Sequence, residues 1–486
     1  MEHPEWALKH KRKGTELRCI RGKYYLYEVS SQWDKVKKRA KKITGKCIGS
    51  ISENGLTPTK NTVINNNVND LPFRIKKFGS FYFFLELSKD IIPALKKYFP
   101  DSWKQLLCIA CTRLFNRSAI KNMPFYFEAS MFSEYFSGLA FSDKTIGALI
   151  HETGRNQEIV EGFMREFIPD KHLVIIDATP IFSKSKNIYE AQMGYNNKKV
   201  WENQVNLLYL YDPVLALPLF YRLTQGDIRE VKTLELAIIT AGLRNAIVVG
   251  DKGFTSELNM EIIEQSDFSY ILPLKRNSSY IDYKSIDNNK MNMDGFFKYK
   301  KRYIWFKESK IKDKRRVIVF LDDQLRISEE QDYLDRIERK CENYSKEEFL
   351  RLQPRMGTIT IIDNICDREA KEIYYTYKSR CEIEQLFDIF KNELSADTTY
   401  MHSIESLKGW LFINHLALMM YYRIFKLLKD NDILDKYSVD DVIAHLEHIY
   451  AVDVNTHWKL CPSSHKSSKL LKSINVNIPI TWIKES

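Results

Sequence analysis

Two short apolar segments, each ending in an aspartate, constrain this fold more than any other feature of the sequence. Residues 171–177 and 245–251 are rich in Val and Ile and end in Asp177 and Asp251. Runs of this length and composition predict buried β-strands. Because parallel strands deliver functional groups at their carboxyl ends, we expect both carboxylates at one edge of a single sheet. Taken singly, each aspartate is better explained as a turn residue or a helix cap after its strand.

The segment between the two aspartates predicts a hairpin followed by a helix. Residues 203–212 and 214–225 have strand patterns and are joined by turn residues at Asp212-Pro213, and residues 232–243 have helical periodicity. The complete order is strand, hairpin, helix, strand, helix, strand and final helix. This order predicts an α/β core with a mixed sheet flanked by helices.

A third acidic candidate lies on the predicted final helix. Tyr377, Arg380, Glu384 and Lys391 follow one another at steps of three, four and seven residues, which return to one side of an α-helix. A second, apolar stripe would seat this helix on the core. The stripe consists of Ile383, Phe387, Phe390 and Leu394. The polar face therefore offers one acid among basic groups, an arrangement suited to a metal ion and a phosphate backbone.

These residues resemble the signature of the DDE insertion-sequence transposases, in the branch marked by a Tyr-x2-Arg-x3-Glu-x6-Lys helix. The resemblance covers residues 171–425 and implies an RNase H-like catalytic core. It extends to Gln204 before the second strand, to Gly226-Asp227 after the third, and to the segment 251–254. Cys381 stands where many relatives have Trp, a departure that we expect to alter packing more than chemistry.

The resemblance assigns catalytic and metal-binding roles to Asp177, Asp251 and Glu384. Ionised carboxylates that converge repel one another unless cations neutralise them, and oxygen ligands suit Mg²⁺ or Mn²⁺. We expect two ions, with Asp251 bridging both and the other two acids completing the metal shell. Asp388, one turn beyond Glu384, lacks the frame of the motif, and we expect a salt bridge with Arg380, Lys391 or another base instead.

The same resemblance implies a DNA substrate. Arg380 and Lys391 are expected to contact transposon-end DNA, whereas Tyr377 either positions the helix or contacts DNA. The implied activity is a transposase that cleaves phosphodiester bonds at transposon ends and transfers the strands into target DNA. Its partners would be double-stranded terminal inverted repeats and target DNA, bound by a homodimer on paired ends. The alternatives are an RNase H-like nuclease or resolvase without strand transfer, and a domesticated DNA-binding protein.

Positive charge is concentrated in two places, although the net charge is only +11. Residues 1–50 contain 14 Lys and Arg against 5 Asp and Glu, with a dense cluster at 35–42. The second tract, residues 298–316, interleaves cations with aromatic rings, a pattern suited to phosphate contact and base stacking. Its candidate DNA-binding residues are Lys300, Lys301, Arg302 and Trp305. In some relatives an aromatic residue here stabilises a flipped base, but a half-buried strand aromatic is the commoner role for such a Trp.

The remaining segments complete the domain plan. Residues 1–75 predict a basic β segment and linker, residues 76–170 a helical DNA-binding region, and residues 277–360 a β-rich insertion against the transposon end. The core parts are 171–276 and 361–435, followed by a C-terminal tail, 436–486, whose Ser- and Lys-rich stretch 463–472 we expect to be mobile.

Three further sequence features concern the structure of the helical region and the cellular location of the protein. The two predicted helices within 141–167 fit either a helix-turn-helix or a pair of core helices. Cys108 and Cys111 fit core cysteines better than zinc ligands. The sequence contains no long apolar run or signal-peptide pattern, so we expect a cytoplasmic, nucleoid-associated prokaryotic protein without a membrane partner.

Overall fold

The structure is a computed structural model that describes most of the 486 residues. The described residues are 3–34, 39–59, 74–170, 172–195, 201–225, 237, 239–286, 290–312, 314–365, 367–454, 457–479 and 481–482. Gly226, Asp227, half of the predicted helix 232–243, residues 35–38 and most of the linker fall outside them. The chain divides into two compact units, Met1–Ile75 with Val452–Thr456 and Lys76–Ala451 with His457–Ser486.

The first unit is a small antiparallel sheet with the strand order β1-β2-β3-β4. Its elements are α1 (Glu5–Leu8), β1 (Thr15–Ile20), β2 (Lys23–Asp34), β3 (Arg39–Ser52) and β4 (Gly55–Pro58). Ala7, Leu17, Leu26 and Ile51 form its core. β2 and β3 are the longest of its four strands.

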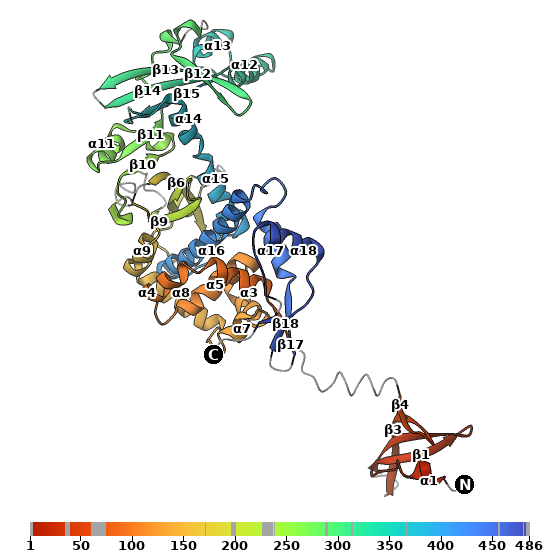
Figure 1. Ribbon diagram of the computed structural model, residues 1–486. Coiled ribbons are helices and arrows are strands. Elements are labelled where there is room, and N and C mark those ends of the chain that lie inside the picture. Colours follow the sequence, from red (N-terminus) through yellow and green to blue (C-terminus); the bar gives the residue numbers. More distant parts are fainter. Residues whose placement is uncertain are drawn as a thin grey trace. The chain divides into compact units, whose positions relative to one another are not determined.

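A bundle of helices in the second unit surrounds the long buried helix α16 (Ile404–Asp430), as Figure 1 shows. The other helices are α3 (Gly79–Leu87), α4 (Ile91–Tyr98), α5 (Trp103–Asn116), α6 (Met123–Ala129), α7 (Phe132–Tyr135), α8 (Asp143–Arg155) and α9 (Gln157–Arg165), with the short η1 (Ile120–Asn122). Apolar residues on α5 and on α16 are buried along most of both helices, so this region has an extensive core. None of the described helices is both long and apolar enough to cross a membrane.

The pair α8 and α9 packs as core helices. Only Asn156 separates them, whereas a helix-turn-helix joins its helices by a turn of three or four residues. Ile150 and Gly154 of α8 are buried, and α8 packs along α16. A Cβ atom at Gly154 would overlap the backbone of Glu405, so glycine permits this close crossing. The packing favours the core-helix alternative over a DNA-reading motif.

One mixed sheet carries the rest of the second unit, with the order β12-β13-β14-β15-β11-β10-β6-β8-β7. In addition β9 pairs with β8, and β16 pairs with β6. The strands are β6 (His172–Ser183), β7 (Gln192–Tyr195), β8 (Trp201–Asp212), β9 (Leu217–Gln225), β10 (Ala246–Val249), β11 (Ser269–Pro273), β12 (Gly295–Tyr299), β13 (Arg302–Lys312), β14 (Arg315–Asp322), β15 (Thr358–Asp363) and β16 (Thr398–Thr399). The predicted mixed α/β core is confirmed.

The central strands follow the sequence prediction closely. β6, β10 and β11 are parallel, and the hairpin β8–β9 turns at Asp212. The Asp212 carboxylate accepts hydrogen bonds from the backbone N–H groups of Val214 and Leu215, at 2.8 and 2.9 Å, which fixes the turn. The helix α11 (Glu257–Gln265) connects β10 to β11.

The segment 277–360 is joined directly to the mixed sheet. β12, β13 and β14 extend that sheet through β15, and the segment also contains α12 (Asp323–Glu338) and α13 (Lys346–Leu352) with the turns η3 (Tyr283–Ser285), η4 (Lys290–Asn292) and η5 (Gln353–Arg355). A buried ion pair between Arg316 of β14 and Asp363 of β15, 3.1 Å apart, ties the two together. The strands of this segment are therefore continuous with the core.

The C-terminal part is folded wherever it is described. It contains α14 (Ala370–Lys378), α15 (Cys381–Asp388), the π-helix η6 (Ile389–Glu393), α17 (Val439–Glu447), β17 (Tyr450–Val454), β18 (His457–Leu460), α18 (His465–Ser473) and β19 (Thr481–Trp482). A further short strand, β5 (Ile75–Lys77), precedes α3 in the chain. The expectation of a mobile stretch at 463–472 is wrong, because α18 occupies most of it. Buried Leu470 and Leu471 anchor that helix, and a Ser464 cap begins it.

Candidate active site

Asp177 lies within β6, not at its end. The apolar run stops at Asp177, but the strand continues to Ser183 because its second half pairs with β8, as far as Phe182 opposite Gln204. β10 pairs with β6 only as far as Ile175, opposite Val249. The Asp177 carboxylate therefore lies just beyond the end of the neighbouring parallel strand, and it accepts a hydrogen bond from the Ala178 N–H at 2.8 Å.

Asp251 follows β10 and begins the short 3-10 helix η2 (Lys252–Phe254). Its carboxylate accepts a hydrogen bond from the Lys252 N–H at 2.5 Å, as an N-cap does. Continuing the pairing of Ile175 with Val249 by two residues places Asp177 opposite Asp251. Both predicted aspartates act electrostatically on Arg380, although only Asp251 lies after the end of its strand.

The motif from Tyr377 to Lys391 is not one regular helix, contrary to the prediction. Tyr377 lies in α14, Arg380 begins α15, Glu384 lies within α15, and Lys391 lies in the π-helix η6. The break has a local cause: the Ser379 hydroxyl donates to the Thr376 carbonyl at 2.6 Å, a side-chain bond that competes with the helical ladder. The four side chains therefore follow a bent axis.

The apolar stripe of the motif is confirmed. Ile383, Phe387, Phe390 and Leu394 are all buried. The rings of Phe387 and Phe390 lie 6.4 and 6.3 Å from the Tyr209 ring, between centroids. Tyr209 is the partner of Asp177 across β6 and β8, and cross-strand partners share one face of a sheet. The third predicted acid is thus carried on a helix that packs on the face to which Asp177 belongs.

Arg380 links the first and third acids. One guanidinium nitrogen lies 3.5 Å from an Asp177 carboxylate oxygen, and the other forms an ion pair with Glu384. Burial alone would lower the pKa of Arg380, but Glu384, Tyr377 and both aspartates reverse this and raise it. Burial also raises the pKa of the Tyr377 phenol, which Arg380 lowers and Asp251 raises. All three predicted acids therefore act electrostatically on Arg380, and Asp251 and Glu384 also act on Tyr377.

The donor set fits a hard divalent cation. The three acids offer only oxygen atoms, and the Asp177 side chain is 17% exposed while that of Glu384 is 54% exposed. Within the described residues, no three acidic, His or Cys groups are already arranged around a metal position. In this arrangement the Arg380 guanidinium supplies the positive charge between Asp177 and Glu384.

Lys391 and Asp388 lie beyond Glu384 on the same bent segment. Lys391 is half-buried in η6. Asp388 is exposed, and the Asn392 amide donates to its carboxylate at 2.5 Å. Arg380 is occupied by Asp177 and Glu384, so the expected salt bridge of Asp388 with Arg380 is absent from the ion pairs of the described residues.

The basic turn between β12 and β13 packs against α14. The Tyr299 ring lies 5.2 Å from Tyr374 and 5.1 Å from Tyr375, and the Tyr375 hydroxyl donates to the Lys298 carbonyl at 2.8 Å. Lys300, Lys301 and Arg302 follow in this turn and are exposed. The predicted DNA-binding cations are therefore carried to the helix that also bears Tyr377.

Lys378 is a member of this neighbourhood that the motif did not single out. Burial lowers the pKa of its ammonium group, and Arg302 and Lys300 lower it further while Asp322 raises it. Arg302 itself forms a 3.0 Å ion pair with Asp322. The sequence signal was only the position of Lys378 next to Tyr377.

Two cations at the end of the basic tract have structural roles. Arg315 forms a 2.8 Å ion pair with Glu264, and Arg316 is buried beside Asp363. Because ion pairs hold both guanidinium groups within the fold, we no longer expect these two residues of the basic tract to bind phosphate. Trp305 is half-buried on β13, 4.9 Å from the Phe296 ring and with the Lys290 ammonium 5.0 Å from its own ring.

Arg113 is a buried cation that sequence patterns could not connect with this site. Its guanidinium donates to the Leu394 carbonyl at the end of η6 and to the Asn414 side chain of α16, the latter at 2.9 Å. Its charge also lies 4.5 Å above the Trp410 ring. Arg113 thereby fixes the far end of the segment that carries Glu384.

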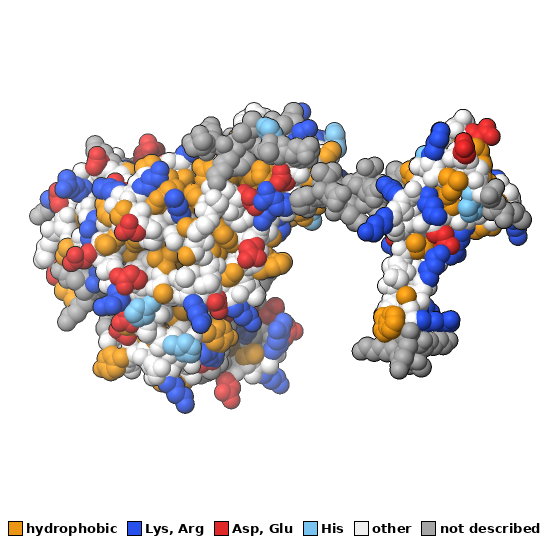
Figure 2. Space-filling model, turned by 90° about the horizontal axis from the view of Figure 1, so that it is seen from below, with side chains coloured by type: hydrophobic (Ala, Val, Ile, Leu, Met, Phe, Trp, Pro, Cys, Tyr) orange, Lys and Arg blue, Asp and Glu red, His pale blue; other side chains and the backbone are white. Residues whose placement is uncertain are grey.

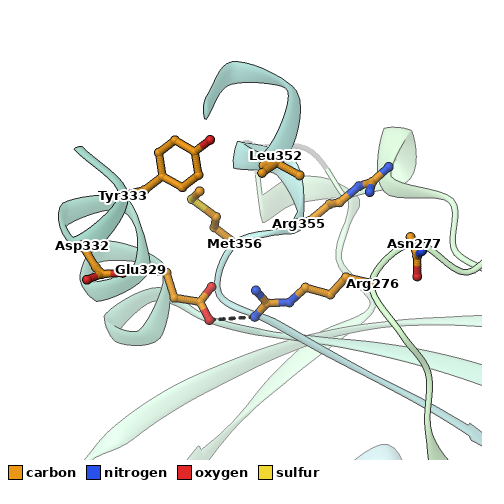
Figure 3. A pocket seen from close by; sticks show the side chains of 8 residues that line it. All are labelled: Arg276, Asn277, Glu329, Asp332, Tyr333, Leu352, Arg355 and Met356. Atoms are coloured by element: carbon orange, nitrogen blue, oxygen red, sulfur yellow. Dashed lines mark hydrogen bonds and ion pairs between the residues drawn. The ribbon is translucent and has the colours of Figure 1, made fainter. Parts of the chain in front are cut away.

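A cavity of about 390 Å³ lies elsewhere and contains none of the predicted site residues. Its lining residues, seen in Figure 3, are Arg276, Asn277, Glu329, Asp332, Tyr333, Leu352, Arg355 and Met356. Arg276 points to Glu329 across it, with a nitrogen-to-oxygen distance of 2.9 Å. The candidate active site is therefore the group of carboxylates around Arg380, not this cavity.

A protein-family model described as a transposase DDE domain matches residues 168–420, a range that includes all three acids. No curated protein sequence matches the chain significantly. Two similar solved structures are the synaptic complex of the piggyBac transposase with hairpin DNA and the paired-end complex of the Mos1 transposase with the left transposon end. The first has a TM-score of 0.38 and 11% identity over 76% of this chain and 70% of that chain. The second has a TM-score of 0.15 and 12% identity over 32% and 53%.

Proposed function

The chain belongs to the transposase DDE domain family and is a DNA transposase, and we propose that Asp177, Asp251 and Glu384 are its catalytic carboxylates. The observation that supports this assignment is that the three acids, from three separate elements of the fold, all act on Arg380, which contacts Asp177 and Glu384 directly.

The three acids would hold one or two Mg²⁺ or Mn²⁺ ions through oxygen atoms only. Bound ions supply the positive charge that phosphodiester cleavage and strand transfer need at the attacking and leaving oxygens. The protein would supply position: Asp177 follows the part of β6 that pairs with β10, Asp251 follows β10, and the buried apolar stripe of α15 would hold Glu384. Since phosphoryl transfer depends mainly on positioning and charge, an activated Ser or Cys is unnecessary.

We assign Arg380 a second task on DNA. If bound cations neutralised the charges of Asp177 and Glu384, the Arg380 guanidinium would no longer be held by these acids and would bind a backbone phosphate. Lys391 and Tyr377 would act beside it. Lys300, Lys301 and Arg302 would extend the contact across the β12–β13 turn.

Trp305 belongs to an aromatic cluster on the same two strands. Its neighbour Phe296 is 58% exposed, and Tyr303, 6.1 Å from the Phe296 ring, is 57% exposed. Exposed rings next to cations suit base stacking, which we propose for this cluster. Cutting and joining two transposon ends requires two active sites, so we propose a homodimer on paired ends.

The test is strand cleavage and joining with purified protein and a labelled transposon-end duplex in Mg²⁺. Asp251→Asn should retain DNA binding and lose both products. Asp388→Asn, which removes an exposed acid from the same motif segment, is the matched control and should retain them. Cleavage by Asp251→Asn would refute the triad, and cleavage without any joined product would indicate a nuclease or resolvase.

A further inference from the structure

The hairpin formed by β2 and β3 projects beyond the sheet of the first unit. β1 pairs with β2 only as far as Glu28, and β4 pairs with β3 only over Gly49–Ser52. The two long strands nevertheless remain paired to Asp34 and Arg39. The projecting part therefore has no neighbouring strand among the described residues, and at about 3.4 Å per residue its six pairs reach about 20 Å. We call residues 29–34 and 39–44 the ribbon.

The ribbon has no apolar core of its own. Every described side chain from Arg39 to Gly45 is exposed, as are Ser30 to Trp33 on the other strand. The core of the unit lies at the opposite end, around Leu17 and Leu26. An isolated two-stranded hairpin is only marginally stable in water, so a ribbon of this length implies a partner that covers it.

The exposed positive charges of the ribbon indicate what kind of partner would cover it. Gln32 pairs with Lys41, and Arg39 lies two residues along β3, so these side chains share one face. Arg39 and Lys41 form no ion pair with another described residue. On the other face Lys42 is held by Glu16 at 2.6 Å, and the indole of Trp33 is 63% exposed. Lys and Arg side chains prevail over this unit in Figure 2.

We propose that the ribbon is a double-stranded DNA-binding element that enters a groove of the duplex. The major groove admits a two-stranded β-ribbon, cations bind the phosphates that line it, and a Gln side chain hydrogen-bonds to base edges. Association with a second copy of the ribbon is disfavoured because both copies carry the same positive charge. This inference rests on the proposed transposase function, and it assigns initial DNA capture to the first unit and not to α8 and α9.

The test uses the full chain and fluorescence anisotropy with a labelled duplex of about 30 base pairs from the DNA flanking the coding sequence. The double variant Arg39→Gln, Lys41→Gln removes two phosphate contacts, so affinity near 0.1 M salt should fall about 50-fold and the salt slope by about 1.8. The matched control Lys9→Gln, Lys11→Gln removes two exposed charges from the same unit outside the ribbon and should bind like the parent protein.

A second measurement does not depend on substitution. Hydrogen exchange of the parent chain should slow in the ribbon when the duplex is added, and should not change in β4. The inference would be overturned if exchange in the ribbon did not change and the double variant bound the duplex with parental affinity. It would also be overturned if the double variant lost affinity only for a single-stranded probe in the same anisotropy assay. Asp251→Asn separates this result from the proposed function, because it should bind the duplex fully while producing no cleavage.

Discussion

The crossing of α8 and α16 gives the sharpest stability prediction. A Cβ atom at Gly154 would lie 2.6 Å from the Glu405 carbonyl carbon and 2.7 Å from the Gly409 nitrogen, against about 3.5–4.0 Å for an unstrained contact. The nearest atom is the Glu405 carbonyl oxygen, and backbone atoms cannot rotate away, so Gly154→Ala requires the two helices to separate. Overpacking of this kind costs about 3 kcal/mol or slightly more, from which the higher helix propensity of Ala recovers about 1 kcal/mol.

The control lies on the same helix. A Cβ atom added at Gly147 would have no other atom within 4 Å, so Gly147→Ala should stabilise the protein by about 0.5–1 kcal/mol. Urea unfolding followed by far-UV circular dichroism measures both variants, with the midpoint of Gly154→Ala shifted down and that of Gly147→Ala shifted up. If Gly154→Ala unfolded at the same urea concentration as Gly147→Ala, the close crossing would be wrong, and α8 would again be available as a DNA-reading helix.

Two further predictions concern the site and the core beneath it. Arg380→Gln should reduce the salt slope of transposon-end binding, measured by anisotropy, by about 0.9. The control Arg336→Gln, on exposed α12, should leave the salt slope unchanged. An unaltered slope for Arg380→Gln would assign Arg380 a purely structural role. His415 is buried, its Nδ1 lies 2.7 Å from the Tyr209 hydroxyl, and burial lowers its pKa to about 3. Because the unfolded chain binds this proton near pH 6.5 and the folded chain does not, stability should fall on acidification from pH 6.5 towards 3, by at most about 1.4 kcal/mol per pH unit. His415→Leu should lose this component of the slope in unfolding measurements, and an identical pH profile would contradict the assignment.

Local patterns were sufficient for the central strands and for the hairpin turn. The Val- and Ile-rich runs before Asp177 and Asp251 form β6 and β10, and the Asp212 side chain fixes the turn as its position before Pro213 suggested. The apolar stripe on α15 was equally readable, since helical spacing alone determines which residues face the core.

What could not be predicted depends on contacts between distant residues. β6 continues past Asp177 because β8 pairs with it, which the Ala-Thr-Pro sequence after Asp177 does not signal. The π-helix ends where Arg113, far away in the chain, binds the Leu394 carbonyl. Likewise the basic tract loses Arg316 to Asp363, a partner visible only once β14 and β15 are paired.

The limited length of β10 also explains a proline in the middle of β6, the strand that carries Asp177. β10 covers one edge of β6 only through Ile175, and β16 covers that edge again only from Phe182. Pro180 lies in the gap between them and has no N–H to donate. A proline is tolerated where a strand has a free edge, and it prevents another strand from docking there. Among the described residues, Pro180 therefore leaves this edge of β6, next to Asp177, without a paired strand.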